Sequence, residues 1–76
     1  MNERLKYIRN HFKLSQDEFG KKINVTRSHV SALEKSKRTI TDRIINDICR
    51  EFNVNEEWLR YGTGEMFAPT FNDKLD

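Results

Sequence analysis

Five residues between positions 27 and 35 carry side chains suited to reading the edges of base pairs. They are Arg27, Ser28, Ser31, Ala32 and Lys35. On a helix that advances about 100° per residue, they share one arc of about 140°, away from Val30 and Leu33. An Arg can fork onto guanine, a Ser can donate or accept, and an Ala can touch the methyl group of thymine. The same residues would also fit an ordinary solvent-exposed helix face. The residues around them in the sequence must therefore decide between the two interpretations.

The charge of the chain is concentrated in its first part. The 76 residues have a net charge of +2, but residues 1–43 hold eleven Lys or Arg against five Asp or Glu, whereas residues 44–76 hold three against seven. The first part is therefore +6 and the second −4. A basic half offers a polyanion something to bind. The charge distribution alone only slightly favours nucleic acid as the ligand, because most charged domains distribute their charge somewhat unevenly along the chain.

Two short helices are expected to position the arc. Ser15 followed by Glu18 predicts a capping box at the start of a helix that runs to about Ile23. Asn24 tolerates a left-handed backbone and so permits a sharp turn. Thr26 then predicts the N-cap of the second helix, which carries the arc.

The second helix is expected to end near Lys35 and to pack closely against the first. The apolar residues expected between them are Phe19, Ile23, Val25, Val30 and Leu33. Gly20 is expected at the closest approach, where a larger side chain would push the helices apart. The spacing predicts a helix-turn-helix.

Three further helices are predicted from apolar residues at helical spacing and from caps. One covers about residues 2–12, another about residues 41–52, and the last starts at Asn55 and is stopped by Gly62 and Gly64. The apolar positions of the first two are Leu5, Ile8, Phe12, Ile44, Ile45, Ile48, Cys49 and Phe52. We therefore expect an all-α, compact five-helix bundle.

The length allows one domain, expected over residues 1–67, followed by a short tail over residues 68–76 that is expected to continue into a longer chain. No run approaches the ~20 apolar residues of a membrane span, and neither a signal peptide nor a membrane is expected. A single cysteine agrees with a reducing, cytoplasmic compartment. Past the last helix, Met66, Phe67 and Phe71 must either fold back on the core or bind a protein partner.

Other chemistry finds little support in the residue pattern. His11 and His29 have no further ligand at metal-binding spacing, so no metal or cofactor is expected. Cys49 lies among apolar residues and is expected to be a packed thiol. The serines have no glycine-rich elbow or paired base, so no enzyme is expected.

Two blocks resemble the Cro and phage-repressor family of helix-turn-helix regulators, also called the xenobiotic-response-element type. They are LSQDEFGKKINVTRSHVSALEKSKR and FNVNEEWLRYGTGEMF, and the resemblance covers about residues 4–67. It implies a lambda-repressor-like fold and a transcriptional regulator, expected to be a repressor, that binds double-stranded DNA. A homodimer on a palindromic operator is implied, in a bacterial or phage-derived cytoplasm and on the nucleoid when bound.

The resemblance also implies roles for particular residues. Base contacts are expected from Arg27, Ser28 and Ala32, joined by Ser31 of the same arc. Phosphate contacts are expected from Gln16, Thr26, Lys35, Lys37, Arg38 and Arg43. Gln16 is further implied to brace the first outward residue of the recognition helix. Arg9 and Glu34 match a partly buried salt bridge between the first and third helices, and Trp58 and Leu59 match core and dimer-side positions.

The sequence departs from the family pattern at two positions. Ser36 stands where the family usually has a glycine after the third helix, which predicts a looser exit turn. Arg27 replaces a commoner glutamine, which shifts the expected base preference toward guanine. The alternative function is an antitoxin-like or other protein-binding module that uses the same fold to hold a partner through its apolar tail.

Overall fold

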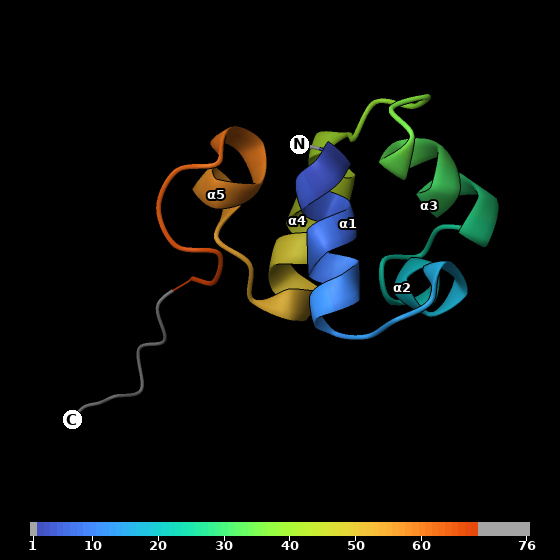
Figure 1. Cartoon of the computed structure of the whole chain (residues 1–76), viewed down its shortest axis with the longest axis horizontal. Helices are drawn as coiled ribbons and strands as arrows, with labels where there is room; N and C mark the ends of the chain where they lie inside the picture. The colour runs from blue at the N-terminus through green and yellow to red at the C-terminus, as the bar shows by residue number, and fades with distance from the viewer. Residues whose placement is uncertain (1, 69–76) are drawn as a thin grey trace.

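The computed structural model describes residues 2–68 and contains five helices over them (Figure 1). The helices are α1 (Asn2–His11), α2 (Gln16–Lys22), α3 (Arg27–Glu34), α4 (Asp42–Phe52) and α5 (Glu56–Tyr61). Figure 1 shows α2 and α3 at one end of the molecule and α5 at the other, with α1 and α4 between them. The predicted all-α bundle, with α2 and α3 packed as the helix-turn-helix, is confirmed.

Each helix after α1 begins at a side chain that caps it. The hydroxyl oxygen of Ser15 accepts from the amide of Glu18 at 3.0 Å, and the Glu18 carboxylate accepts from the amide of Ser15 at 2.8 Å. Thr26, Thr41 and Asn55 accept from first-turn amides in α3, α4 and α5. Because these caps satisfy amides that the helix itself leaves unpaired, the helix starts follow closely from the sequence.

Helices α1 to α4 are each followed by a residue in the left-handed conformation, and none of the four residues is a glycine. They are Lys13, Asn24, Ser36 and Asn53, with φ between 56° and 62°. The prediction of a looser turn at Ser36 is wrong. The amide of Ser36 donates to the carbonyl of Leu33 at 3.2 Å, and that of Lys37 donates to Ala32 at 2.8 Å. These bonds make a complete Schellman turn, in which Ser36 bears the steric cost that a glycine would avoid.

All five helices and the three segments that connect α2 to α5 contribute to the apolar core. Its buried members are Leu5, Ile8, Phe19, Ile23, Val30, Leu33, Ile40, Ile44, Ile45, Ile48, Phe52, Val54 and Leu59. The rings of Phe19 and Phe52 stack with their centroids 5.2 Å apart and so join α2 to α4. Ile40 and Val54, which lie outside the helices, were not expected in the core. Phe12 was expected on the apolar side of the first helix, but it follows the end of α1 and is 39% exposed.

Helices α2 and α3 approach closely at Gly20. A Cβ atom on Gly20 would lie 2.5 Å from the carbonyl oxygen of Val25 and 3.2 Å from a methyl group of Val30. The amide of Val25 also donates to the carbonyl of Gly20 at 2.9 Å, so the turn folds directly over the glycine. The crossing of the two helices therefore depends on the missing side chain.

The chain after α5 folds back on the core. Val54 and Phe67 form an antiparallel bridge, and the amide of Asn55 donates to the carbonyl of Met66 at 2.9 Å. Met66 and Phe67 are half-buried and pack against the core. Phe71, predicted to act with them, lies outside the described residues. Of the two alternatives predicted for Met66 and Phe67, folding back on the core or binding a protein partner, the structure shows the first.

Two further predictions concern the chain as a whole. Over residues 2–68, every helix is too short or too polar to cross a lipid bilayer. Of the tail expected over residues 68–76, only Ala68 lies within the described residues, and its amide donates to the carbonyl of Asn53 at 2.9 Å.

We expect Gly20→Ala to lower the free energy of unfolding by about 2 kcal/mol. Overpacking costs about 1 to 3 kcal/mol, and the better helix propensity of alanine returns about 1 kcal/mol at most. Urea denaturation followed by circular dichroism measures the difference. Lys22→Ala, an exposed change in the same helix, is the control and should stay within about 0.5 kcal/mol of the parent. Equal stability of the two variants would contradict a tight contact at Gly20.

We expect Ser36→Gly to raise the free energy of unfolding by about 0.5 to 1 kcal/mol. Glycine removes a left-handed penalty of about 1 to 2 kcal/mol, and part of this gain is lost because glycine makes the unfolded chain more flexible. Ser36→Ala is the matched control, since it deletes the hydroxyl and keeps Cβ, and it should bring no gain. The same urea titration distinguishes the variants. A destabilised glycine variant would show that the Ser36 side chain contributes more than its backbone strain costs.

Candidate nucleic-acid interface

The outward face of α3 carries the residues predicted to contact bases. Arg27 and Ser28 are exposed in its first turn, while Ser31 and Ala32 are half-buried further along. Within residues 2–68 the guanidinium of Arg27 has no ion-pair partner, so its donors are available to a ligand. The hydroxyl oxygen of Thr26 accepts from the backbone amide at the third position of α3 at 3.1 Å. Its proton remains able to donate to a phosphate oxygen.

Four basic residues predicted to contact phosphates follow α3 in the chain. Lys35 is the C-cap of α3, and Lys37 and Arg38 lie in the connection to α4; all three are exposed. Arg43, in the first turn of α4, is exposed as well, but its Nε lies 3.7 Å from a carboxylate oxygen of Asp47. Over residues 2–68, three of the four cations therefore have no acidic partner, and Arg43 shares its charge with Asp47.

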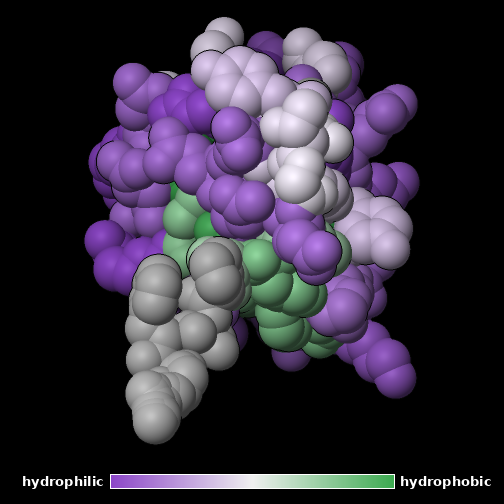
Figure 2. All heavy atoms as spheres, turned by 90° about the vertical axis from the view of Figure 1, so that its left-hand side faces the viewer, coloured by the Kyte–Doolittle hydropathy of each residue, from purple (hydrophilic) through white to green (hydrophobic). Residues whose placement is uncertain are grey.

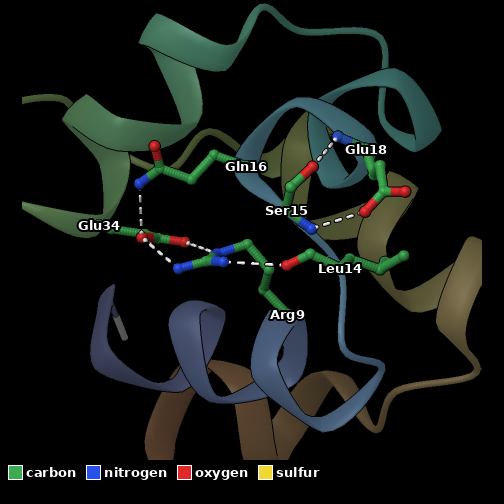
Figure 3. A network of polar contacts seen from close by, with 6 residues as sticks. All are labelled: Arg9, Leu14, Ser15, Gln16, Glu18 and Glu34. Atoms are coloured by element: carbon green, nitrogen blue, oxygen red, sulfur yellow. Dashed lines mark hydrogen bonds and ion pairs between the residues drawn. The ribbon is translucent and has the colours of Figure 1, made fainter.

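A largely buried ion pair joins α1 to α3 (Figure 3). Nε of Arg9 lies 2.6 Å from Oε2 of Glu34, and Nη2 lies 3.3 Å from Oε1. Nη1 of Arg9 also donates to the carbonyl of Leu14 at 2.9 Å. The side chains of Arg9 and Glu34 are only 14% and 5% exposed. These two charges, which the resemblance paired, are engaged inside the protein.

Gln16 meets a different partner from the one the resemblance implied. Its Nε2 donates to Oε1 of Glu34 at 3.1 Å, whereas the resemblance implied a brace to the first residue of α3. The amide thus extends the Arg9–Glu34 ion pair to the first residue of α2. Because Nε2 carries two hydrogens and Glu34 takes one, the second can still donate to a phosphate.

The start of α2 is held by the capping box next to Gln16. Hydrogen bonds from the backbone and side chain of Ser15 lower the pKa of Glu18, because they favour its charged form. A lowered pKa in the folded state means that this contribution to stability is present at neutral pH and is lost as the pH falls through that pKa. At neutral pH the capping box therefore keeps the first turn of α2, and with it Gln16, in place.

Several polar contacts have no counterpart in the predictions, among them those of Arg4 and Asp47. Arg4 donates from Nε and Nη2 to the carbonyls of Leu59 and Arg60, at 3.0 and 3.1 Å, and so satisfies the end of α5. Asp47 is buried on α4, with a carboxylate oxygen 2.7 Å from Nη2 of Arg50. The spacing of Asp47 and Arg50 on one helix face was a readable signal. Arg4 offered none, since its partner lies 55 residues away.

Two observations concern the side chains that metal or nucleophile chemistry would use. Within residues 2–68, no three His, Cys, Asp or Glu side chains gather where they could hold a metal ion. Burial raises the pKa of the Cys49 thiol, and the nearby carboxylate of Glu56 raises it further. A protonated thiol is a poor nucleophile and a poor metal ligand.

A second surface, on α1 and α5, exposes aromatic rings. Tyr7 and Tyr61 are 60% and 71% exposed, and the ring of Tyr7 lies edge-on to that of Trp58 with centroids 6.2 Å apart. We call Tyr7, Trp58 and Tyr61 the aromatic face. The hydrophobic atoms coloured green in Figure 2, which views the molecule from the side of α5, belong to other residues, because Tyr and Trp are slightly hydrophilic on its hydropathy scale and are drawn pale purple. The aromatic face has chemistry suited to a protein contact.

Comparison with known proteins gives one match. A family model described as helix-turn-helix matches residues 5–59, which is well over half of the chain and includes all of α2, α3 and α4. No curated protein matches the chain, and no solved structure does.

We expect Arg9→Met to lower the free energy of unfolding by about 3 kcal/mol, because it leaves the buried carboxylate of Glu34 without its counter-ion. Lys21→Met is the matched control. It removes an exposed pair with Asp17 and should cost at most about 1 kcal/mol. Urea denaturation at neutral pH measures both. Combining Arg9→Met with Glu34→Met should recover much of the loss, and a double variant no more stable than Arg9→Met would contradict this account.

Proposed function

This chain belongs to the Cro/C1-type family of helix-turn-helix DNA-binding transcription regulators, and we propose that it is a repressor that binds a specific double-stranded site. In this proposal α3 enters the major groove, where Arg27, Ser28, Ser31 and Ala32 meet base edges. The protein acts in the cytoplasm, on the nucleoid when bound, and the function includes no catalytic step. It needs neither a metal nor a cofactor.

The observation that carries the proposal is the exposure of the first turn of α3. Val30 and Leu33 are buried on the opposite side of that helix, and Gly20 sets its packing against α2. Arg27 and Ser28 are therefore held outward by a rigid contact and do not rely on a flexible loop. A guanidinium without an acidic partner at this point suits a base edge rich in acceptors.

Phosphate contacts supply affinity in this proposal, and base contacts supply the choice of sequence. The phosphate set is Gln16, Thr26, Lys35, Lys37, Arg38 and Arg43. Three of these residues, Lys35, Lys37 and Arg38, are exposed cations at the end of α3 and in the connection that follows it. Their charges have no competing carboxylate within residues 2–68, so they lose little on meeting a polyanion.

We propose a homodimer on a palindromic operator as the binding form. Two copies related by a two-fold axis would place their α3 helices about 34 Å apart, which is one turn of DNA. The aromatic face on α1 and α5 supplies apolar surface for the contact between copies. Two-fold symmetry would then appear in the operator as two inverted half-sites.

The same aromatic face supports a second candidate, an antitoxin-like module that holds a protein partner. Tyr7 and Tyr61 remain largely exposed although Met66 and Phe67 have folded back on the core. Co-purification of one defined small protein, lost in a Tyr61→Ser variant that still binds DNA, would support this reading. A chain that elutes alone as a dimer supports the first.

The test of the proposed function is selection of duplexes from a random pool, followed by titration at several salt concentrations. The affinity should fall steeply with salt, with a slope of about −0.9 per phosphate contact. Arg27→Ala should cost about 1 to 3 kcal/mol and relax the preference at one base pair, whereas Lys37→Ala should weaken all sequences alike and reduce the slope by about 1. An affinity that hardly changes with salt would count against the proposal.

A further inference from the structure

A buried carboxylate on α4 lies between two arginines of the same helix. Arg43 precedes Asp47 by four residues and Arg50 follows it by three, so all three side chains share one face of α4. The Asp47 side chain is only 11% exposed, whereas both arginines are exposed. A buried charge needs a partner of opposite sign. Asp47 therefore has two cations within reach and depends on one of them.

The two arginines hold Asp47 unequally. Nη2 of Arg50 donates to Oδ1 of Asp47 at 2.7 Å, which is a short, charge-assisted hydrogen bond. Nε of Arg43 lies 3.7 Å from Oδ2, which is too far for a hydrogen bond. Arg50 thus satisfies the buried carboxylate by direct contact, and Arg43 contributes only attraction across a gap.

The positions of the two arginines on α4 also differ. Arg43 lies in the first turn and Arg50 in the last. Because the helix dipole favours cations at the C-terminal end and opposes them at the N-terminal end, it holds Arg50 in place but not Arg43. About 10 Å separates the two residues along the helix axis. Only Arg43 is at the end of α4 that adjoins the connection carrying Lys37 and Arg38.

The pairing of Asp47 decides what Arg43 is able to do. Among the ion pairs that the structure describes over residues 2–68, Asp47 takes part in these two. If Arg50 were absent, Arg43 would be the remaining counter-ion, and turning it toward a phosphate would leave a buried charge unpaired at high cost. With Arg50 present, Asp47 keeps its hydrogen-bonded partner when Arg43 turns away.

We propose that Arg50 is a positioning residue that frees Arg43 for the DNA backbone by holding the buried carboxylate of Asp47. This inference rests on the proposed function, in which Arg43 contacts a phosphate, and deepens it. Arg50 itself makes no contact with DNA in this arrangement. The two arginines of one helix face then have separate roles, since one neutralises the acid and the other binds the ligand.

The test uses the full chain and the duplex that it prefers in selection from a random pool. Titrations at several salt concentrations give the slope of log affinity against log salt, which changes by about 0.9 for each phosphate contact. Arg43→Met should make this slope shallower by about 0.9. Arg50→Met should make it shallower by the same amount although Arg43 is still present, because Asp47 then retains Arg43.

Removal of the acid separates positioning from direct phosphate binding by Arg50. In the Arg50→Met background, Asp47→Asn should restore the parent slope, because Arg43 is no longer held. The control is the same Asp47→Asn change in a chain that carries both Arg43→Met and Arg50→Met, where the slope should stay at the Arg43→Met value. Asp47→Asn adds the same charge in both backgrounds, so an equal recovery in both would be a general electrostatic effect and would overturn the proposal.

Every variant in this set either keeps a cation beside Asp47 or replaces the acid, so none contains an unpaired buried charge. Circular dichroism checks that each variant is folded before titration. If Arg50→Met is unfolded, Arg50→Gln takes its place, because it removes the charge and retains a hydrogen-bond donor.

The outcomes for the two proposals are distinct. An Arg50→Met variant that keeps the parent slope overturns the positioning role. A shallower slope that Asp47→Asn does not restore overturns it as well, since Arg50 would then contact DNA itself. An Arg43→Met variant with the parent slope has the same consequence, and in these cases the regulator function stands. A parent that binds no duplex in a salt-dependent way removes the proposed function itself.

Discussion

The helix-turn-helix of this protein depends on one backbone contact, at Gly20. The carbonyl of Val25 lies so close to the Gly20 Cα that no side chain fits between them, and this contact sets how α3 leaves the turn. With α3 fixed, Val30 and Leu33 are buried and Arg27 must face outward. A helix of eight residues would be unstable alone, so its orientation comes from packing and not from its own propensity.

Helix α1 holds the other elements around that contact with polar side chains from both of its ends. Near its start, the side-chain amide of Asn2 donates to the carbonyl of Leu33 at the end of α3, and Arg4 donates to carbonyls at the end of α5. Near its end, Arg9 pairs with Glu34. Helix C-termini leave carbonyls unsatisfied, so long side chains that bind them join distant elements at little desolvation cost. A 76-residue chain with a small core gains order from such ties.

The parts of the structure that were predictable from the sequence are those decided within a few residues. Helix starts followed from caps such as Ser15 and Thr26, and the role of Gly20 followed from the spacing of the apolar residues around it. The contacts of Arg4 and the Gln16–Glu34 bond were not predictable, because they depend on where long side chains reach across the fold. Ile40 and Val54 were missed for a related reason: residues outside helices have no periodicity to reveal burial.

Internal pairing decides which of the basic residues remain for a ligand. Arg9 is engaged by Glu34, Arg4 by backbone carbonyls and Arg43 in part by Asp47, so a count of charges overstates what this half of the chain presents to DNA. The cations without an acidic partner within residues 2–68 include Arg27, Lys35, Lys37 and Arg38, which are close together in the chain on α3 and the connection after it. Lys6, Lys13 and Lys22 are exposed and also form no ion pair within residues 2–68, so the unpaired positive charge is densest near α3 but not confined to it. A local excess of positive charge is what a phosphate backbone attracts. The buried carboxylate of Glu34 pairs with Arg9 and not with Arg27. It therefore stabilises the fold without neutralising a cation of the proposed DNA-binding surface.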